Sequence, residues 1–192
     1  MQDKVILTDC DGVILDWEYH FNQWMLKRNY IVHDEAAYDI GKRFNIPPNL
    51  KKLYVRAFNE SAWVGKMSPL RDAVKYVKKL HEEHGYVFHA ITSLSDDIYA
   101  QELRTQNLKN LFGETAFEKF VYCDTGADKD DVLAPYEGSG CYWVEDKPEN
   151  ANLGVSLGLK SILVAHAHNA DYQRYGVERV QNWKEIYSII TD

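Results

Sequence analysis

The sequence predicts an α/β fold in which helices cover both faces of a parallel sheet of about five strands. Three observations support this prediction. Short apolar runs alternate with helical patterns, polar residues cluster directly after these runs, and one helix-rich segment interrupts the alternation after the first run. The 192 residues are enough for one core domain with a modest insertion.

Five apolar runs are expected to form the strands of this sheet. They occupy residues 5–8, 86–91, 120–122, 141–144 and 161–164. Each run is short, is rich in β-branched or aromatic residues and is followed by polar residues. Continuous apolar runs of this length are typical of parallel strands, which are buried on both faces.

Helical patterns fill the connections between these runs. Ser68 and Pro69 are typical of a helix start, an apolar stripe follows, and Gly85 is placed to end the helix. Further helices are expected after the N-cap residue Ser95, over residues 148–158 and over residues 183–190.

Residues 16–67 break this alternation, because they have a helical pattern throughout and are dense in aromatic side chains. Two helical stripes stand out in the segment: Trp17, Phe21, Trp24 and Met25, then Leu50, Leu53, Tyr54, Ala57 and Phe58. We therefore expect residues 16–67 to form a small helical cap, inserted into a core domain that comprises residues 1–15 and 68–192.

Composition excludes several classes of partner. The formal net charge is −7, and no basic run is long enough to bind a nucleic acid polymer. No apolar stretch approaches the roughly 18 residues of a membrane helix, and the first residues lack the pattern of a signal peptide. We therefore expect a soluble protein with a cytoplasmic location and no membrane partner. The three cysteines show no paired spacing and are expected to be reduced thiols: Cys10, Cys123 and Cys141.

Polar residues follow four of the apolar runs, where parallel sheets bind ligands. The four groups are Asp9, Asp11 and Gly12; Thr92 and Ser93; Lys129; and Glu145 with Asp146. Carboxylates gathered at one sheet edge repel each other unless a cation is bound, and an all-oxygen set suits Mg²⁺ better than zinc. The sequence therefore predicts a site for magnesium and phosphate.

The spacing of the two aspartates allows them to divide the labour of phosphoryl transfer. Asp9 can attack phosphorus while Asp11 handles the proton of the leaving group, because Gly12 lets the chain turn back toward the same substrate. Thr92 and Lys129 would hold the phosphoryl oxygens and offset their charge. The candidate phosphate-binding residues are Thr92, Ser93, Lys129 and Gly12.

These residues, in this order, resemble the four motifs of the haloacid dehalogenase superfamily. The matching motifs are Asp9-Cys10-Asp11-Gly12-Val13, Thr92-Ser93, Lys129 and Glu145-Asp146. The resemblance spans nearly the whole chain and implies a Rossmann-like core. Asp11 resembles the second aspartate of the phosphotransferases, which dehalogenases lack. The resemblance implies that Asp9 forms an aspartyl phosphate and that Asp11 is the general acid and then the base. It further implies that Asp9, the backbone carbonyl of Asp11 and Asp146 hold Mg²⁺, with Glu145 orienting them from behind.

A narrower set of features resembles the 5'(3')-deoxyribonucleotidase branch of that superfamily. These features are Thr92-Ser93, Glu145-Asp146-Lys147-Pro148 and a helical insertion directly after the first motif. The branch usually has two aspartates before the Lys-Pro pair, whereas this chain has Glu145 first. The resemblance implies a nucleoside monophosphate as substrate. It also makes five residues candidates for substrate binding, with Trp63 stacking on the base: Trp63, Trp17, Phe21, Phe44 and Lys66.

Several residues also have plainer interpretations. Taken alone, Asp9 and Asp11 fit a solvated turn, and Lys129 fits a solvated helix start. Cys10 lies between two acids that would destabilise a thiolate, so it is expected to fill space. His166 and His168 lack metal-ligand spacing and are expected to lie in a loop.

The sequence leaves three functional alternatives open. The first is a phosphatase of the same superfamily that acts on a sugar phosphate or another small phosphoester. The second is a receiver-like signalling domain that accepts phosphate, for which Asp124 offers an acceptor. The third is a domain that binds metal without catalysis. The oligomeric state stays open as well.

Overall fold

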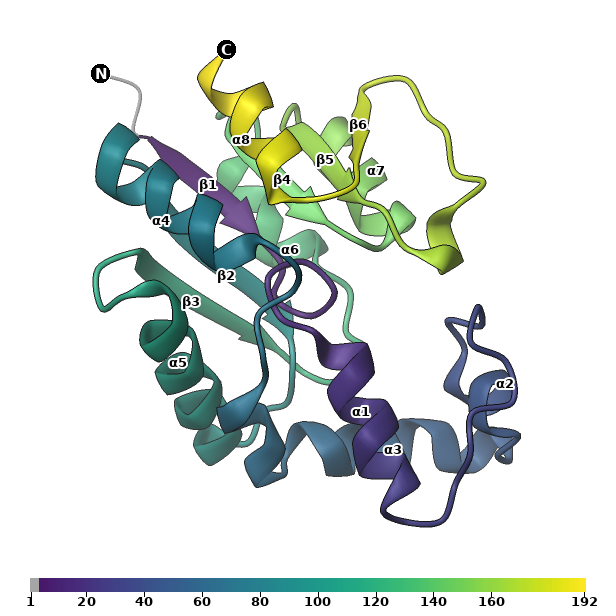
Figure 1. The fold of residues 1–192 in the computed structure, drawn as a ribbon. Helices are drawn as coiled ribbons and strands as arrows, with labels where there is room; N and C mark the ends of the chain where they lie inside the picture. Colours follow the sequence, from purple (N-terminus) through teal and green to yellow (C-terminus); the bar gives the residue numbers. More distant parts are fainter. Residues whose placement is uncertain (1–3) are drawn as a thin grey trace.

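The computed structural model describes residues 4–192 and contains a six-stranded parallel sheet in the order β3-β2-β1-β4-β5-β6 (Figure 1). The strands are β1 (Val5–Thr8), β2 (Val87–Ser93), β3 (Phe117–Cys123), β4 (Tyr142–Glu145), β5 (Lys160–Val164) and β6 (Val177–Val180). The chain builds outward from β1 to β3 and then continues on the other side of β1 with β4. The strand order therefore reverses between β1 and β4, which is where open parallel sheets bind ligands.

All five predicted strands are present, and the sixth was not predicted. β6 lies at the sheet edge, pairs only with β5 and has two exposed polar residues, Glu178 and Arg179. An edge strand with two consecutive exposed polar residues lacks the continuous apolar run by which the buried strands were identified. For a similar reason β3 begins earlier than predicted, because the exposed Glu118 and Lys119 interrupt its apolar pattern.

Helices cover both faces of the sheet. They are α4 (Ala73–His84), α5 (Ile98–Phe112), α6 (Asp130–Leu133), α7 (Pro148–Ser156) and α8 (Trp183–Thr191), with short 3-10 helices η2 (Ala134–Tyr136) and η3 (Ala167–Asn169). Ile6 of β1 packs in one apolar core with Val77 of α4 and Ile186 of α8, whereas the adjacent Leu7 packs in a second core with Leu133 of α6. The alternation along β1 thus produces one core on each face of the sheet.

The predicted helix start at Ser68 is wrong, because α4 begins at Ala73. Residues 68–70 are extended and hydrogen-bond to residues 14–16: Asp16 N donates to the Ser68 carbonyl at 3.0 Å, and Leu70 N donates to the Ile14 carbonyl at 2.9 Å. The two connections between the core and residues 16–67 therefore pair with each other. The N-cap of α5 also differs from the prediction, since Asp97 caps the helix and Ser95 binds Glu60 instead.

Residues 16–67, called the cap segment below, are helical only in part. The helices are α1 (Trp17–Leu26), α2 (Ile40–Phe44), α3 (Pro48–Asn59) and the 3-10 helix η1 (Ala62–Lys66), and residues 27–39 form a loop. Asn29 has a φ of 63°, a left-handed conformation that is incompatible with continuing α1. The predicted stripe on α3 is also only partly correct: Phe58 is buried, but Leu53 and Ala57 are exposed.

Aromatic contacts hold the cap segment together. Phe21 and Trp24 of α1 pack against Phe58 of α3 with ring centroids 5.3 and 5.8 Å away, and η1 packs against α5 of the core. The division into residues 1–15 and 68–192 with an inserted 16–67 stays a prediction, and residues 1–3 lie outside the described residues. Within residues 4–192, no helix has both the length and the apolar character needed to cross a bilayer.

Candidate active site

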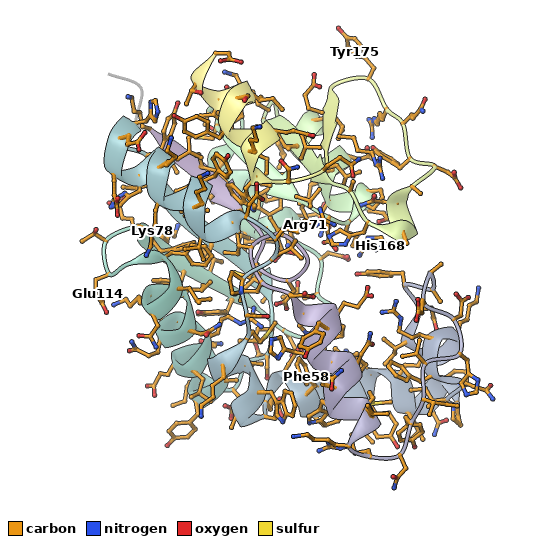
Figure 2. All side chains as sticks on the ribbon, in the orientation of Figure 1. Phe58, Arg71, Lys78, Glu114, His168 and Tyr175 are labelled. Atoms are coloured by element: carbon orange, nitrogen blue, oxygen red, sulfur yellow. The ribbon has the colours of Figure 1, made fainter. Side chains whose placement is uncertain are left out.

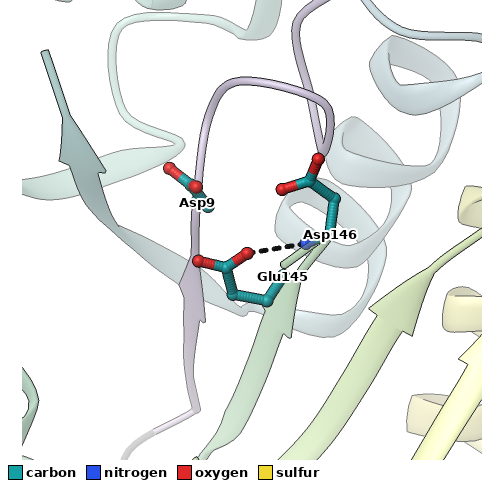
Figure 3. A group of neighbouring side chains, drawn as sticks. All are labelled: Asp9, Glu145 and Asp146. Atoms are coloured by element: carbon teal, nitrogen blue, oxygen red, sulfur yellow. Dashed lines mark hydrogen bonds between the residues drawn. The ribbon is translucent and has the colours of Figure 1, made fainter. Parts of the chain in front are cut away.

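Three carboxylates meet at the ends of β1 and β4, where the strand order reverses. Asp9 directly follows β1, Glu145 ends β4, and Asp146 is the next residue. One carboxylate oxygen from each residue lies within 4.8 Å of the others (Figure 3). All three residues are buried. The backbone N–H of Asp9 donates to the Val144 carbonyl at 2.9 Å, so the pairing of the two strands itself sets this spacing.

Lys129 supplies the cation of this group from the start of α6. Its Nζ lies 2.7 Å from Asp9 Oδ2 and 2.7 Å from Glu145 Oε1, and the residue is 1% exposed. This burial excludes the interpretation of Lys129 as a solvated helix start. One ammonium group is therefore shared by two buried carboxylates.

Glu145 uses both of its oxygens within the protein. Oε1 accepts hydrogen bonds from Lys129 and from Asn150 Nδ2 at 2.6 Å, and Oε2 accepts from the backbone N–H groups of Asp146 and Lys147 at 2.7 Å. Burial works to raise the pKa of Glu145, but Lys129 and these hydrogen bonds outweigh it and lower the pKa below its usual value. This arrangement suits an orienting group better than a metal ligand.

Asp9 and Asp146 carry negative charge that is not fully compensated. Burial raises the pKa of Asp9 to about 6 even though Lys129 opposes the shift. Burial, followed by the charges of Glu145 and Asp9, raises the pKa of Asp146 well above its usual value. A divalent cation between these oxygens would favour both ionised forms, so the donor set fits Mg²⁺. The placement of the Asp11 backbone carbonyl in this shell stays a prediction.

Gly12 is required at its position for two reasons. Its φ of +73° is left-handed, and a Cβ there would overlap the Asp146 carboxylate. Its carbonyl also accepts a hydrogen bond from His166 Nε2 at 2.6 Å, while His168 Nε2 lies 3.1 Å from the Asp146 carbonyl. The two histidines thus support the backbone of the site from the segment after β5. His166 caps the 3-10 helix η3 and His168 lies within it, so the predicted loop contains a short helical turn.

Asp11 faces a residue that the sequence analysis missed. Arg104 of α5 has no exposed surface, and its Nη1 lies 2.8 Å from Asp11 Oδ1. Burial raises the pKa of Asp11, and Arg104 opposes that shift. One signal was available in the sequence: Arg104 lies four residues from both Ala100 and Leu108, on the buried stripe of its helix.

The predicted phosphate-binding hydroxyls differ in their surroundings. Thr92 is fully buried, and its Oγ1 has no hydrogen-bond partner among the described residues. Ser93 donates to the Ala127 carbonyl at 3.1 Å and lines the adjoining cavity. A buried hydroxyl without a partner is costly, but Thr92 is not among the residues that line this cavity, so its contact with a phosphoryl oxygen stays a prediction.

The buried cysteines have no part in this chemistry. All three cysteines are free thiols, as the sequence predicted. Burial raises the pKa of Cys10 to about 12, so its thiol stays protonated and fills space between Asp9 and Asp11.

A cavity of about 760 Å³ lies between the carboxylate group and the cap segment. One wall of the cavity, called its core side below, is formed by residues outside the cap segment, among them Asp9, Asp11, Lys129 and Asp146. The opposite wall, called its cap side below, is formed by residues of the cap segment, among them Trp17, Phe21, Tyr38 and Lys52. Trp17 and Phe21 stack with ring centroids 4.5 Å apart, so two of the predicted substrate-binding residues do line the cavity.

The other three predicted substrate-binding residues are not among those that line this cavity. Trp63 packs near Phe58 at 6.5 Å and lies under Lys27 Nζ, 4.8 Å from its ring centroid. Phe44 is buried against Phe21, and Lys66 is exposed. Their placement gives no support to direct substrate contact, because helix η1 turns Trp63 toward the aromatic core of the cap segment.

Comparison with known proteins gives one family and one curated relative. The model of the family "5' nucleotidase, deoxy (Pyrimidine), cytosolic type C protein" matches residues 3–192. An uncharacterized 32.4 kDa protein from the Gp30-rIII intergenic region of Enterobacteria phage T4 is 33% identical over 135 residues, which cover 67% of this chain and 48% of that protein. The chain thus spans about half the length of that relative.

Solved structures share the fold at low sequence identity. A haloacid dehalogenase-like hydrolase from Streptococcus pneumoniae has a TM-score of 0.67, 12% identity and 99% coverage of both chains. A putative HAD-hydrolase from Bacillus subtilis has a TM-score of 0.63, 12% identity and 100% coverage of both chains. CbbY from Rhodobacter sphaeroides has a TM-score of 0.62, 16% identity and 96% coverage of both chains. Together with the site geometry, the nearly complete family match shows that this chain belongs to the 5' nucleotidase, deoxy (Pyrimidine), cytosolic type C family.

Proposed function

We propose that this chain is a Mg²⁺-dependent phosphomonoesterase that hydrolyses a small phosphorylated metabolite, with a (deoxy)nucleoside monophosphate as the best candidate. The observation that carries the proposal is the position of Asp9 and Asp11 beside one cavity, with Lys129 in contact with Asp9. The family match supports a nucleotidase. Among proteins of the same fold, CbbY is in complex with phosphate and the Bacillus subtilis hydrolase is bound to magnesium.

In the proposed reaction the two aspartates act in turn. A carboxylate oxygen of Asp9 attacks phosphorus, the ester P–O bond breaks, and Asp11 gives its proton to the departing alkoxide oxygen. A water molecule then attacks the phosphorus of the aspartyl phosphate and gives a proton to Asp11. The bond between phosphorus and Asp9 breaks, and inorganic phosphate leaves.

Three further groups act on the phosphoryl oxygens or on the charge of the site. Lys129 brings a positive charge to Asp9, and Thr92 Oγ1 is free to donate a hydrogen bond to a phosphoryl oxygen. Asp9, Asp146 and the backbone carbonyl of Asp11 would hold Mg²⁺. When bound, Mg²⁺ supplies charge that offsets the buried carboxylates and the phosphate dianion.

The cavity supports a substrate of nucleotide size. Its volume of about 760 Å³ falls in the range usual for small-molecule sites. Trp17, which is partly exposed and stacks on Phe21, offers an aromatic surface to a base. A sugar phosphate is the second candidate, because a mutant of CbbY is in complex with xylulose-(1,5)bisphosphate in a structure of the same fold with a TM-score of 0.61.

The receiver-like alternative depends on Asp124 as the phosphate acceptor. Both oxygens of Asp124 accept hydrogen bonds from Arg56 Nη2 of the cap segment, at 2.6 and 2.7 Å. Asp124 is also absent from the group of carboxylates that can hold a metal in the described part of the chain. Asp9 is therefore the better supported acceptor.

Hydrolysis by wild type and Asp9→Asn, measured on p-nitrophenyl phosphate and on a panel of nucleotides and sugar phosphates, tests the proposal. We expect Asp9→Asn to lower kcat by about 10³-fold or more, because it removes the nucleophile. EDTA should abolish the wild-type activity and Mg²⁺ should restore it.

Asp124→Asn is the matched control, since it removes a carboxylate from a neighbouring loop and should keep most of the activity. Equal rates for wild type and Asp9→Asn, activity that is indifferent to EDTA, or a phosphate adduct on Asp124 would contradict the proposal. The relative kcat/KM values on the panel then decide between nucleotide and sugar phosphate.

A further inference from the structure

Arg104 is a fully buried arginine whose strongest contact is with Asp11. It lies in the middle of α5, and its Nη1 is 2.8 Å from Asp11 Oδ1. Asp11 in turn lines the cavity, and its side chain is 19% exposed. The arginine is therefore inaccessible to solvent and connects to the cavity through one carboxylate.

The other contacts of Arg104 are weak. Nη2 lies 3.5 Å from the sulfur of Met67, which is a poor acceptor. Neither Nε nor Nη1 forms a hydrogen bond of regular geometry among residues 4–192, so the contact between Nη1 and Asp11 is an ion pair. Burying a guanidinium group with so few acceptors is costly, and a fold gains little stability from such a pair compared with apolar packing. Stability alone therefore does not account for an arginine at this position.

Each of the two proposed catalytic aspartates has its own cation. Lys129 contacts Asp9 at 2.7 Å and also Glu145, whereas Arg104 contacts Asp11 alone among the acidic residues that the structure describes. The two cations come from different elements, since Lys129 is the N-cap residue of α6 and Arg104 lies in α5. The carboxylates are thus oriented independently, which matters because one must reach phosphorus and the other the leaving oxygen.

We propose that Arg104 is a positioning residue that holds the Asp11 carboxylate in place for proton transfer to the leaving group. This inference rests on the proposed function. Because Arg104 acts only through Asp11, its removal affects a substrate in proportion to the need of the leaving group for a proton. An alkoxide needs that proton, whereas p-nitrophenolate leaves as a stable anion.

The experiment compares kcat/KM for a nucleoside 5'-monophosphate and for p-nitrophenyl phosphate, since kcat/KM reports the steps up to departure of the alcohol. We expect Arg104→Met to lower kcat/KM for the nucleotide on the order of 10²-fold, and for p-nitrophenyl phosphate less than about 5-fold. Arg104→Lys should restore part of the loss. When Asp11→Asn is already present, Arg104→Met should lower kcat/KM for the nucleotide only slightly further, because the two residues act as one unit.

Asn107→Ala is the matched control. Asn107 is buried on the same face of α5 and donates to the Met67 carbonyl at 3.1 Å, but it is not paired with Asp11. Asn107→Ala should disturb the packing of α5 and change kcat/KM for the two esters by the same factor. If Arg104→Met does not fold, Arg104→Lys is used for the comparison. It should also lower kcat/KM more for the nucleotide than for p-nitrophenyl phosphate, but by a smaller factor.

Equal losses on both esters, or full additivity with Asp11→Asn, would overturn the role of Arg104. That result would leave the proposed function intact if wild type still hydrolyses both esters and Asp9→Asn does not. A wild type that hydrolyses neither ester would instead overturn the proposed function, and the role of Arg104 with it.

Discussion

The two sides of the cavity are held in place in different ways. On the core side, Lys129 is buried and contacts two carboxylates, and Glu145 behind it has a partner for each oxygen. On the cap side, Tyr38 is 60% exposed and rests with its ring 4.6 Å from the ring of His168. The groups proposed for chemistry are thus fixed by burial, whereas Tyr38 on the cap side is held by few contacts.

The contacts that join the cap segment to the core are correspondingly sparse near the cavity. His168 lies at the core edge that faces the loop between α1 and α2 (Figure 2) and connects that loop to Asp146. Arg56 binds Asp124, and Glu60 accepts a hydrogen bond from Ser95 at 2.6 Å. The difference indicates that catalysis and substrate selection can be changed separately, and three variants test this.

Lys129→Met should have the largest effect on stability. It leaves Asp9 and Glu145 buried without their cation, and breaking a buried ion pair in this way costs about 3–5 kcal/mol. Urea unfolding in EDTA measures the loss. Lys52→Met is the control, because Lys52 is an exposed lysine on the cap side of the same cavity and should change stability by less than about 0.5 kcal/mol. Similar losses for the two variants would remove the distinction between the two sides.

Gly12→Ala should have an intermediate effect. A left-handed alanine costs about 1–2 kcal/mol, and its Cβ would push the Asp146 carboxylate away. We expect half-maximal activity to require about 10-fold more Mg²⁺. Gly85→Ala is matched in φ, at +71°, and its Cβ would meet no atom within 4 Å. It should show the same loss of stability and an unchanged Mg²⁺ requirement. A shared shift in Mg²⁺ requirement would mean that Asp146 is not the group affected.

The sequence predicted the core side of the cavity better than the cap side. Asp9, Lys129 and Asp146 follow buried strands, and the carboxyl ends of parallel strands meet at one edge, so their order along the chain was sufficient. Arg104 escaped prediction because its role depends on a single contact with Asp11, which is 93 positions away. Its position on the buried stripe of α5 indicates burial but does not identify Asp11 as its partner.

The errors in the fold have a similar origin. Ser68 and Pro69 have the local pattern of a helix start, but residues 68–70 pair with residues 14–16 and remain extended. The resemblance made Trp63 a candidate for stacking on a base, whereas the turn of η1 buries it partly against Phe58. In the first case a contact between distant segments outweighed a local propensity, whereas the placement of Trp63 depends on a contact within the cap segment itself.

Tyr38→Ala should have the smallest effect on stability, within about 0.5 kcal/mol, because the side chain is largely exposed. If Tyr38 only contacts the substrate, KM for the nucleotide should rise about 3- to 10-fold while kcat stays within 2-fold. Tyr38→Phe keeps the ring beside His168 and separates the contribution of the ring from that of the hydroxyl. A fall in kcat at constant KM would instead place Tyr38 among the groups that act on the reacting atoms. In that case the cap segment would contribute to catalysis as well as to substrate binding. His168 offers the connection, since it contacts both Tyr38 and the Asp146 carbonyl.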